Sequence, residues 1–108
     1  MGRVQRFKPD GTFVLAWGDN EVAPGHFGGH SYMPGPLAVA VDNHDQVWVT
    51  STNGYVHQFA PEGKFVGRIG GEGTEPGQFR LPHGLAFDSQ CHLYVADARN
   101  SRIQKLAL

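Results

Sequence analysis

The strongest constraint on this 108-residue chain is an internal repeat. The segments 2–7 and 54–59, GRVQRF and GYVHQF, have the same pattern at an offset of 52 residues. Further along, Asp42 matches Asp88 at an offset of 46, so the first copy holds six extra residues around 28–35. Self-similarity at this period predicts a fold built from stacked supersecondary units. The predicted repeats cover residues 2–53 and 54–100, and a third repeat begins over 101–108.

Each repeat consists of short apolar runs between turn-forming residues. The 15 Gly and 7 Pro lie mostly between these runs, and Gly tolerates the positive φ angles of tight turns. Runs of this length, bounded by Asp, Ser, Asn and Gly, are typical of strands rather than helices. We therefore expect nine strands and no amphipathic helix. The expected strands are 3–7, 13–17, 37–41, 47–50, 55–59, 65–69, 84–87, 93–96 and 102–106.

A repeat of about 40–50 residues with four strands and no helix is typical of a β-propeller blade. The predicted fold class is therefore all-β, with residues 1–108 forming one propeller segment. Along the chain the strands occupy the third and outer positions of one blade, all four positions of the next, and the inner, second and third positions of the last. Because the inner strand at 37–41 is apolar on both sides, we expect it to be buried on both faces.

Nine strands make a little over two blades, whereas a propeller protects its strand edges by closing a ring. We therefore expect the chain not to exist as an isolated monomer. Three copies with two blades each would complete a six-bladed homotrimer, with one strand per chain displaced. The other interpretation is that a longer parent chain supplies the missing blades.

The motifs PHGLAFD, LYVAD and SRIQKL, together with GKFV and PGQF, resemble NHL repeats, which build six-bladed propellers. The resemblance covers nearly the whole chain and is closest in the last repeat, whereas the first repeat has Leu37 in the place of His83. It implies a scaffold or binding module for a protein, peptide or small-molecule ligand. The insertion in the first repeat contributes the candidate ligand-binding residues, which are Gly28, Gly29, His30, Ser31 and Tyr32.

More distantly, residues 33–106 resemble the lyase domain of the peptidyl-glycine alpha-amidating enzymes, an NHL-like propeller whose Pro-His-small-Leu motif supplies zinc ligands. The matching motif begins at Pro82, so the resemblance implies that His83 is a zinc ligand and that zinc is the cofactor. In a trimer, three copies of His83 would face one axis. The active-site Arg of that family follows Val-Ala-Asp directly; here Ala98 occupies that place, and Arg99, one residue later, is a candidate to bind a substrate carboxylate.

The alternative interpretation of His83 is structural, as a side chain at the channel mouth that is hydrogen-bonded to backbone or water. Asp97 with Arg99 and Arg102 is interpreted as a turn cluster of partly exposed ion pairs, each contributing about 0–1 kcal/mol. Cys91, the only cysteine, precedes His92, but adjacent residues tend to point to opposite sides, so a catalytic pair is not expected.

The net charge of −1 produces no basic field, so neither nucleic acid nor a membrane surface is an expected partner. The sequence has no signal-peptide pattern and no apolar run long enough to cross a bilayer, which predicts a soluble protein and leaves its compartment open.

A third interpretation takes the chain as a fragment or engineered propeller building block without independent activity, because Met1 enters in the middle of a blade.

Overall fold

The computed structural model describes residues 3–18 and 35–108, and these residues form nine strands and one short 3-10 helix, η1. All nine predicted strands are present. Their ends agree with the prediction to within two residues, and three strands have the predicted bounds. The elements are β1 (Val4–Phe7), β2 (Phe13–Trp17), β3 (Val39–Val41), β4 (Val47–Thr50), β5 (Tyr55–Phe59), β6 (Phe65–Gly70), β7 (Pro82–Phe87), β8 (His92–Asp97), η1 (Ala98–Asn100) and β9 (Arg102–Ala107).

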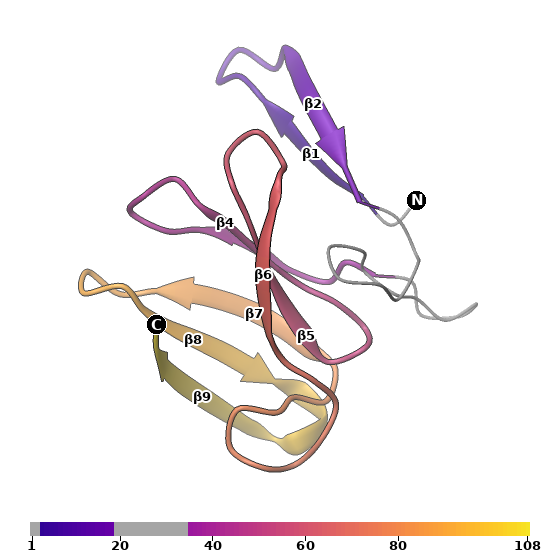
Figure 1. Cartoon of the computed structure of the whole chain (residues 1–108), viewed down its shortest axis with the longest axis vertical. Helices are drawn as coiled ribbons and strands as arrows, with labels where there is room; N and C mark the ends of the chain where they lie inside the picture. Colours follow the sequence, from indigo (N-terminus) through magenta and orange to yellow (C-terminus); the bar gives the residue numbers. More distant parts are fainter. Residues whose placement is uncertain (1–2, 19–34) are drawn as a thin grey trace.

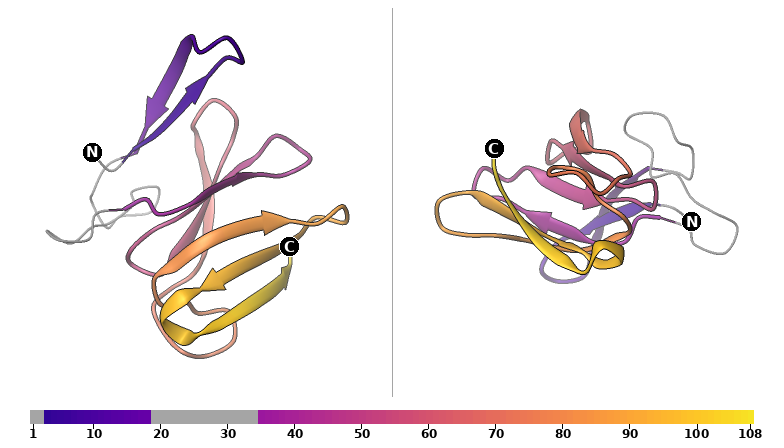
Figure 2. Two further views of the ribbon diagram at one scale, coloured as in Figure 1. Left: turned by 180° about the vertical axis from the view of Figure 1, so that it is seen from behind. Right: turned by 90° about the horizontal axis from the view of Figure 1, so that it is seen from below.

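The strands form three antiparallel sheets in which every strand pairs with its sequence neighbour. We call β1–β2 the N-terminal hairpin, β3–β6 the complete blade and β7–β9 the C-terminal blade. The three sheets follow one another in chain order (Figures 1 and 2). This arrangement confirms the predicted all-β class and the predicted order of strand positions. In the described part of the chain, no helix is long and apolar enough to cross a membrane.

The turns between third and outer strands depend on glycine, as predicted. Gly11 joins β1 to β2 with φ at 91°, and Gly63 joins β5 to β6 with φ at 90°. A side chain at either position would be strained because the left-handed region disfavours a Cβ atom.

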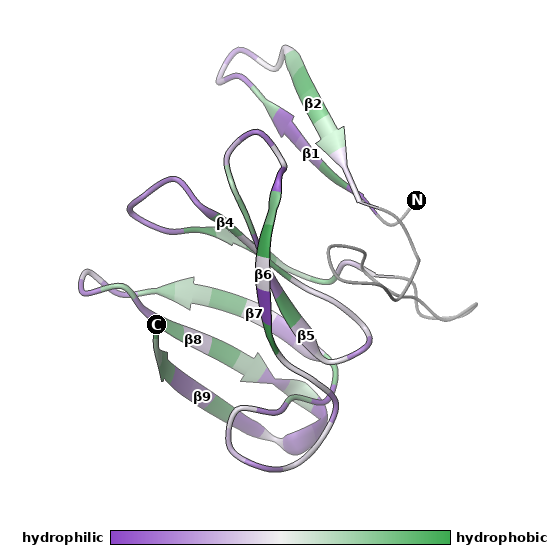
Figure 3. Cartoon of the chain, viewed as in Figure 1, coloured by the Kyte–Doolittle hydropathy of each residue, from purple (hydrophilic) through white to green (hydrophobic). Residues whose placement is uncertain are grey.

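The core lies between the sheets, on both sides of β4. Every residue of β4 is buried, and successive side chains of a strand point to opposite faces. Val47 and Val49 pack toward the N-terminal hairpin, where they meet Trp17. On the other face, Trp48 packs against the C-terminal blade, with its ring centroid 5.8 Å from that of Phe87. Figure 3 shows hydrophobic colour along β2 and much of β7, alternating colour along β8 and hydrophilic colour at the turns.

The inner strand β3 is not buried on both faces, contrary to the prediction. Val39 and Val41 are 55% and 58% exposed. They lie on the face of β3 that is turned toward the N-terminal hairpin, and that hairpin contains only a third and an outer strand. An inner strand is covered by the inner strands of both neighbouring blades, and on this side the described residues contain none.

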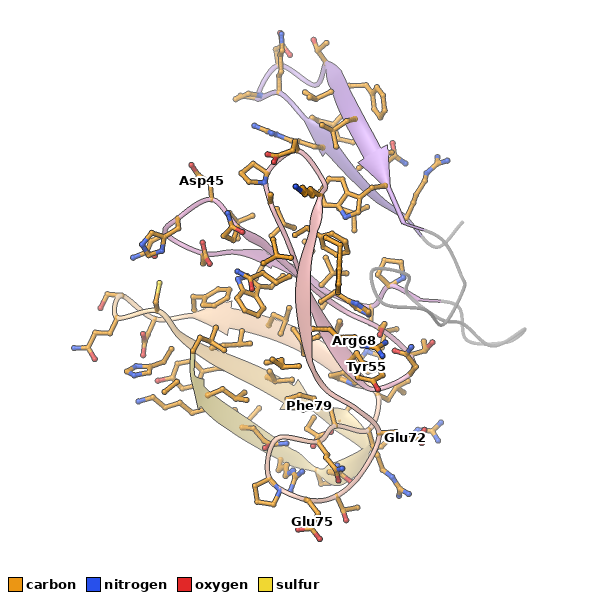
Figure 4. The ribbon with its side chains drawn as sticks, in the orientation of Figure 1. Asp45, Tyr55, Arg68, Glu72, Glu75 and Phe79 are labelled. Atoms are coloured by element: carbon orange, nitrogen blue, oxygen red, sulfur yellow. The ribbon has the colours of Figure 1, made fainter. Side chains whose placement is uncertain are left out.

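The complete blade and the C-terminal blade are connected by residues 71–81, and the part of this connection over 71–79 is anchored by Phe79. This side chain is fully buried and belongs to the cluster around Trp48. Phe79 also forms an isolated parallel bridge with Glu72, and Figure 4 shows the two residues on this connection. A Cβ atom at Gly70 would lie 2.7 Å from the Phe79 ring, so the close approach requires glycine there.

The position of Leu93 between two blades generates a stability prediction. Leu93 is fully buried in the cluster with Trp48, so Leu93→Ala should lower the free energy of unfolding by about 2–5 kcal/mol, through lost burial and the cavity left behind. Urea denaturation followed by tryptophan fluorescence measures this change. Val66→Ala, at a site that is 53% exposed, is the control and should change it by less than about 0.5 kcal/mol. Equal effects would contradict the assigned core.

Candidate functional site

A buried carboxylate organises the end of the C-terminal blade where β8 finishes. Asp97 is the last residue of β8, and its side chain is fully buried. Its Oδ1 accepts a hydrogen bond of 2.7 Å from the backbone N–H of Arg80. Its Oδ2 accepts from Asn100 Nδ2 at 2.8 Å, from Arg102 Nε at 2.9 Å and from Gln104 Nε2 at 3.2 Å. The carboxylate therefore links three parts of the chain, which are the segment before β7, η1 and β9.

The donors that bind Asp97 also hold the connection 71–79 against the blade. Arg102 Nη2 donates to the backbone oxygens of Glu75 and Gln78, each at 3.0 Å. Gln104 Nε2 donates to the Gln78 oxygen at 2.7 Å. One carboxylate thus orients two β9 side chains, which in turn satisfy backbone carbonyls that no strand partner reaches.

The electrostatics of this cluster keep Asp97 charged. Burial raises its pKa, but the hydrogen bonds from the Arg80 N–H, Asn100, Arg102 and Gln104 lower it by more, so the net pKa is below the usual value. The sequence correctly placed Asp97 in a cluster with Arg102. The ion pair is partly exposed only at Arg102, whose side chain is 31% exposed. The carboxylate itself is fully buried, because the connection 71–79 and β9 cover it.

Three basic side chains lie exposed near this cluster, and we call Arg80, His83 and Arg99 the basic rim. The Arg99 N–H donates to the Arg80 oxygen at 3.0 Å, which brings the two backbones together. His83 lies within β7, at a bulge between Pro82 and Gly84, opposite the end of β8. Bulges re-aim side chains and are frequent beside functional sites. Exposed guanidinium groups can bind a carboxylate through paired hydrogen bonds.

The rim also has acidic neighbours. Glu72 and Glu75 are exposed on the connection that packs on the same end of the blade (Figure 4). The surface there carries both signs of charge, which suits a ligand with both a carboxylate and donor groups. The sequence analysis named His83 and Arg99 as candidates but missed Arg80, which the backbone hydrogen bond from Arg99 brings to the rim.

The described residues of one chain do not form a metal site. No group of three His, Cys, Asp or Glu side chains in residues 3–18 and 35–108 could hold a metal ion, and Asp97 is already bound by four donors. His83 would be the sole ligand that one chain contributes from this rim. The predicted ligand-binding residues Gly28, Gly29, His30, Ser31 and Tyr32 lie outside the described residues.

The complete blade has other side chains at the positions of the carboxylate cluster. Strand register places Ser51 where the C-terminal blade has Asp97, and His57 where it has Gln104. Ser51 Oγ lies 3.1 Å from His57 Nε2, and both residues are fully buried. Nearby, the Arg68 guanidinium stacks 3.8 Å above the Tyr55 ring, as Figure 4 shows. Both side chains of this pair therefore lie in the interior of the complete blade.

A second aspartate shapes the opposite end of the C-terminal blade. Asp88 Oδ1 accepts from the backbone N–H groups of Gln90 and His92, each at 2.9 Å, and Oδ2 lies 3.1 Å from both His92 Nδ1 and the Tyr94 hydroxyl. The backbone N–H of His92 is the largest cause that lowers the pKa of Asp88, to about 2. Asp42 makes the equivalent turn in the complete blade.

The fold and the blade-end cluster together define an all-β repeat protein built of propeller blades. Comparison with protein families matches residues 79–106 to the NHL repeat. The chain therefore contains an NHL repeat, and its sheets are propeller blades of the NHL type.

Comparison with characterised proteins identifies peptidyl-glycine alpha-amidating monooxygenases as relatives. The Mus musculus protein is 38% identical over 88 residues, which is 75% of this chain and 9% of the relative. The Rattus norvegicus protein is 39% identical over the same shares. The form named B of Xenopus laevis is 46% identical over 57 residues, 48% of this chain and 6% of the relative. The chain thus spans less than a tenth of the length of these relatives.

The lowered pKa of Asp88 generates a prediction for acid stability. Because its pKa is about 2 in the folded state, against 3.8 ordinarily, the ionised carboxylate stabilises the fold above about pH 4, and this contribution is lost as pH falls toward 2. Asp88→Asn should therefore be less stable at pH 7 and should lose less stability on acidification.

Tyr94→Phe removes one of the donors to Asp88 and should give an intermediate acid response. Thermal denaturation between pH 2 and pH 7 measures all three proteins. Some acid sensitivity should remain in each variant, because the pKa values of Asp42 and Asp97 are lowered as well. An Asp88→Asn profile parallel to that of the unmodified chain would contradict the assignment.

Proposed function

We propose that this chain is a propeller scaffold that binds a peptide ligand at the basic rim of the C-terminal blade. The carrying observation is that Arg80 and Arg99 are exposed and joined through their backbones, while Asp97 is buried and fully engaged. The Asp97 carboxylate is therefore committed to holding the scaffold, and the exposed Arg80 and Arg99 side chains remain accessible to a carboxylate of a ligand.

Two further observations support a peptide as the ligand class. The exposed Glu72 and Glu75 on the adjoining connection offer acceptors for backbone or amino N–H groups. The relatives are named for peptidyl-glycine, a peptide that ends in a carboxylate. A rigid blade holding exposed polar groups at one end is an arrangement that orients such a ligand without large conformational change.

A second candidate function is a zinc-dependent lyase activity in an assembled ring. The supporting observation is that His83 is exposed at a bulge of an inner strand, together with the similarity to amidating monooxygenases over 75% of the chain. One chain supplies one such His, so this candidate requires His83 from three copies. Three imidazoles are a sufficient ligand set for a catalytic zinc with one position left for water or substrate.

The peptide proposal is tested with one short peptide prepared with a free C-terminal carboxylate and with an amidated C-terminus. We expect the carboxylate form to bind at least about tenfold more tightly, and Arg80→Ala or Arg99→Ala to remove most of that difference, which corresponds to about 1.4 kcal/mol. Fluorescence anisotropy of the labelled peptides measures the affinities. Lys64→Ala removes an exposed charge at the opposite end of the strands and serves as the control. Equal affinity for both peptides would contradict the proposal.

The zinc candidate makes a separate prediction. Protein purified without a metal-affinity tag should contain about one zinc per three chains, and His83→Ala should remove it. Metal analysis on the peak from size-exclusion chromatography measures the ratio. Zinc that persists in His83→Ala would assign the metal to other residues, and metal-free protein would exclude this candidate while leaving the peptide proposal in place.

A further inference from the structure

The two ends of the chain carry equivalent third strands. The motif of β1 repeats that of β9 at an offset of 99 residues. In the C-terminal blade, Arg102 and Gln104 of β9 bind the buried carboxylate of Asp97, and Lys105 lies 5.6 Å from the Tyr94 ring centroid. The equivalent pairs are Arg3 and Arg102, Val4 and Ile103, Gln5 and Gln104, Arg6 and Lys105, and Phe7 and Leu106.

In the N-terminal hairpin the same donors are present without their carboxylate. When the Gln5 amide is turned so that its oxygen faces the guanidinium group, that oxygen accepts from Arg3 Nε at 2.9 Å and from Arg3 Nη2 at 3.0 Å. The two side chains therefore lie together on one side of β1. Within the described residues, no acidic side chain pairs with Arg3. Strand β1 therefore has the donors needed to pair with a strand at the second position of a blade that ends in a buried Asp. In the described chain, β8 is such a strand.

The apolar faces at the two ends are also complementary. On the N-terminal side, a hollow of about 440 Å³ is bounded by Val4, Phe7 and Trp17 of the hairpin and by the exposed Val39 and Val41 of β3. The equivalents of Val39 and Val41 in the C-terminal blade are Leu85 and Phe87, which pack against the face of the complete blade that contains Trp48.

On the C-terminal side, the face equivalent to that of Trp48 is uncovered. Tyr94 is the counterpart of Trp48, and Ile103 on the same face is 67% exposed. Gly84, Ala86 and Ala96 complete this face. The described residues therefore carry one uncovered face of each kind. The contact between the complete blade and the C-terminal blade shows how two such faces fit. Such a pair of surfaces produces head-to-tail association, which closes into a ring when the rotation allows.

We propose that the N-terminal hairpin of one copy docks on β8 of a second copy, where β1 replaces that copy's β9. The completed blade has the order β7-β8-β1-β2, with its inner two strands from the second copy. Arg3 and Gln5 donate to Asp97 of the partner subunit, and the partner's inner strands cover Val39 and Val41. Exchange of β9 for β1 preserves the bonds to the carboxylate, adds β2 as an outer strand and covers both open faces. Each copy then contributes two blades, and three copies make six.

Cross-linking tests this exchange directly in the full chain. Tyr94 lies opposite Lys105 in the β8–β9 register, so the proposal places Tyr94 opposite Arg6 of another copy. Directly opposed residues on antiparallel strands have Cα atoms about 4.5–5.5 Å apart, within the range of a disulfide. In a Cys91→Ser background, Arg6→Cys with Tyr94→Cys should form intermolecular disulfides, with products up to three times the 11.8 kDa chain on a non-reducing gel.

Two matched pairs provide the controls. Val14→Cys with Tyr94→Cys places one cysteine on the outer strand and should not cross-link. Lys105→Cys with Tyr94→Cys reports whether β9 stays in place. Complete closure of this pair within single chains, with no product from the Arg6 and Tyr94 pair, would overturn the proposal.

Light scattering measures the mass of the unmodified chain in solution, so this test does not depend on whether the cysteine variants fold. A mass of three chains at micromolar concentration is expected, and Arg3→Ala should weaken assembly at least about tenfold while Lys8→Ala leaves it unchanged. A folded monomer over this range, or equal assembly of Arg3→Ala and the unmodified chain, would refute the exchange.

Discussion

The buried carboxylate of Asp97 is the interaction on which the C-terminal blade depends. A charge removed from water is costly unless hydrogen bonds replace its hydration, and here four donors do so. Because those donors come from the segment before β7, from η1 and from β9, the carboxylate fixes the relative positions of three parts of the chain. The exposed Arg80 and Arg99 owe their proximity to this arrangement.

Packing between sheets provides the rest of the stability. Strand β4 is buried on both faces because a sheet lies on each side of it. Within residues 3–18 and 35–108, another inner strand covers β3 on one side only, and Val39 and Val41 on its other side are exposed. A blade is therefore a unit whose burial is supplied by adjacent blades.

Much of the fold could be predicted because its signals are local. Apolar runs and turn residues such as Gly63 located all nine strands, and the repeat assigned each its position in a blade. The candidate site was predicted in part: His83 and Arg99 were identified through a resemblance, and Asp97 was placed in a cluster. Arg80 was missed, because its relation to Arg99 is a backbone hydrogen bond between segments nearly twenty residues apart.

The sequence by itself determined the strands, their order and the equivalence of β1 with β9, since these depend on periodicity and on patterns within a few residues. Only the tertiary structure decided that Asp97 is buried and that β4 is covered on both faces while β3 is not. It also decided that Arg3 and Gln5 lie together with no acidic partner among the residues that the structure describes. Burial and pairing depend on which segments meet in space, and the same short motif has a different environment when its neighbouring strand is absent.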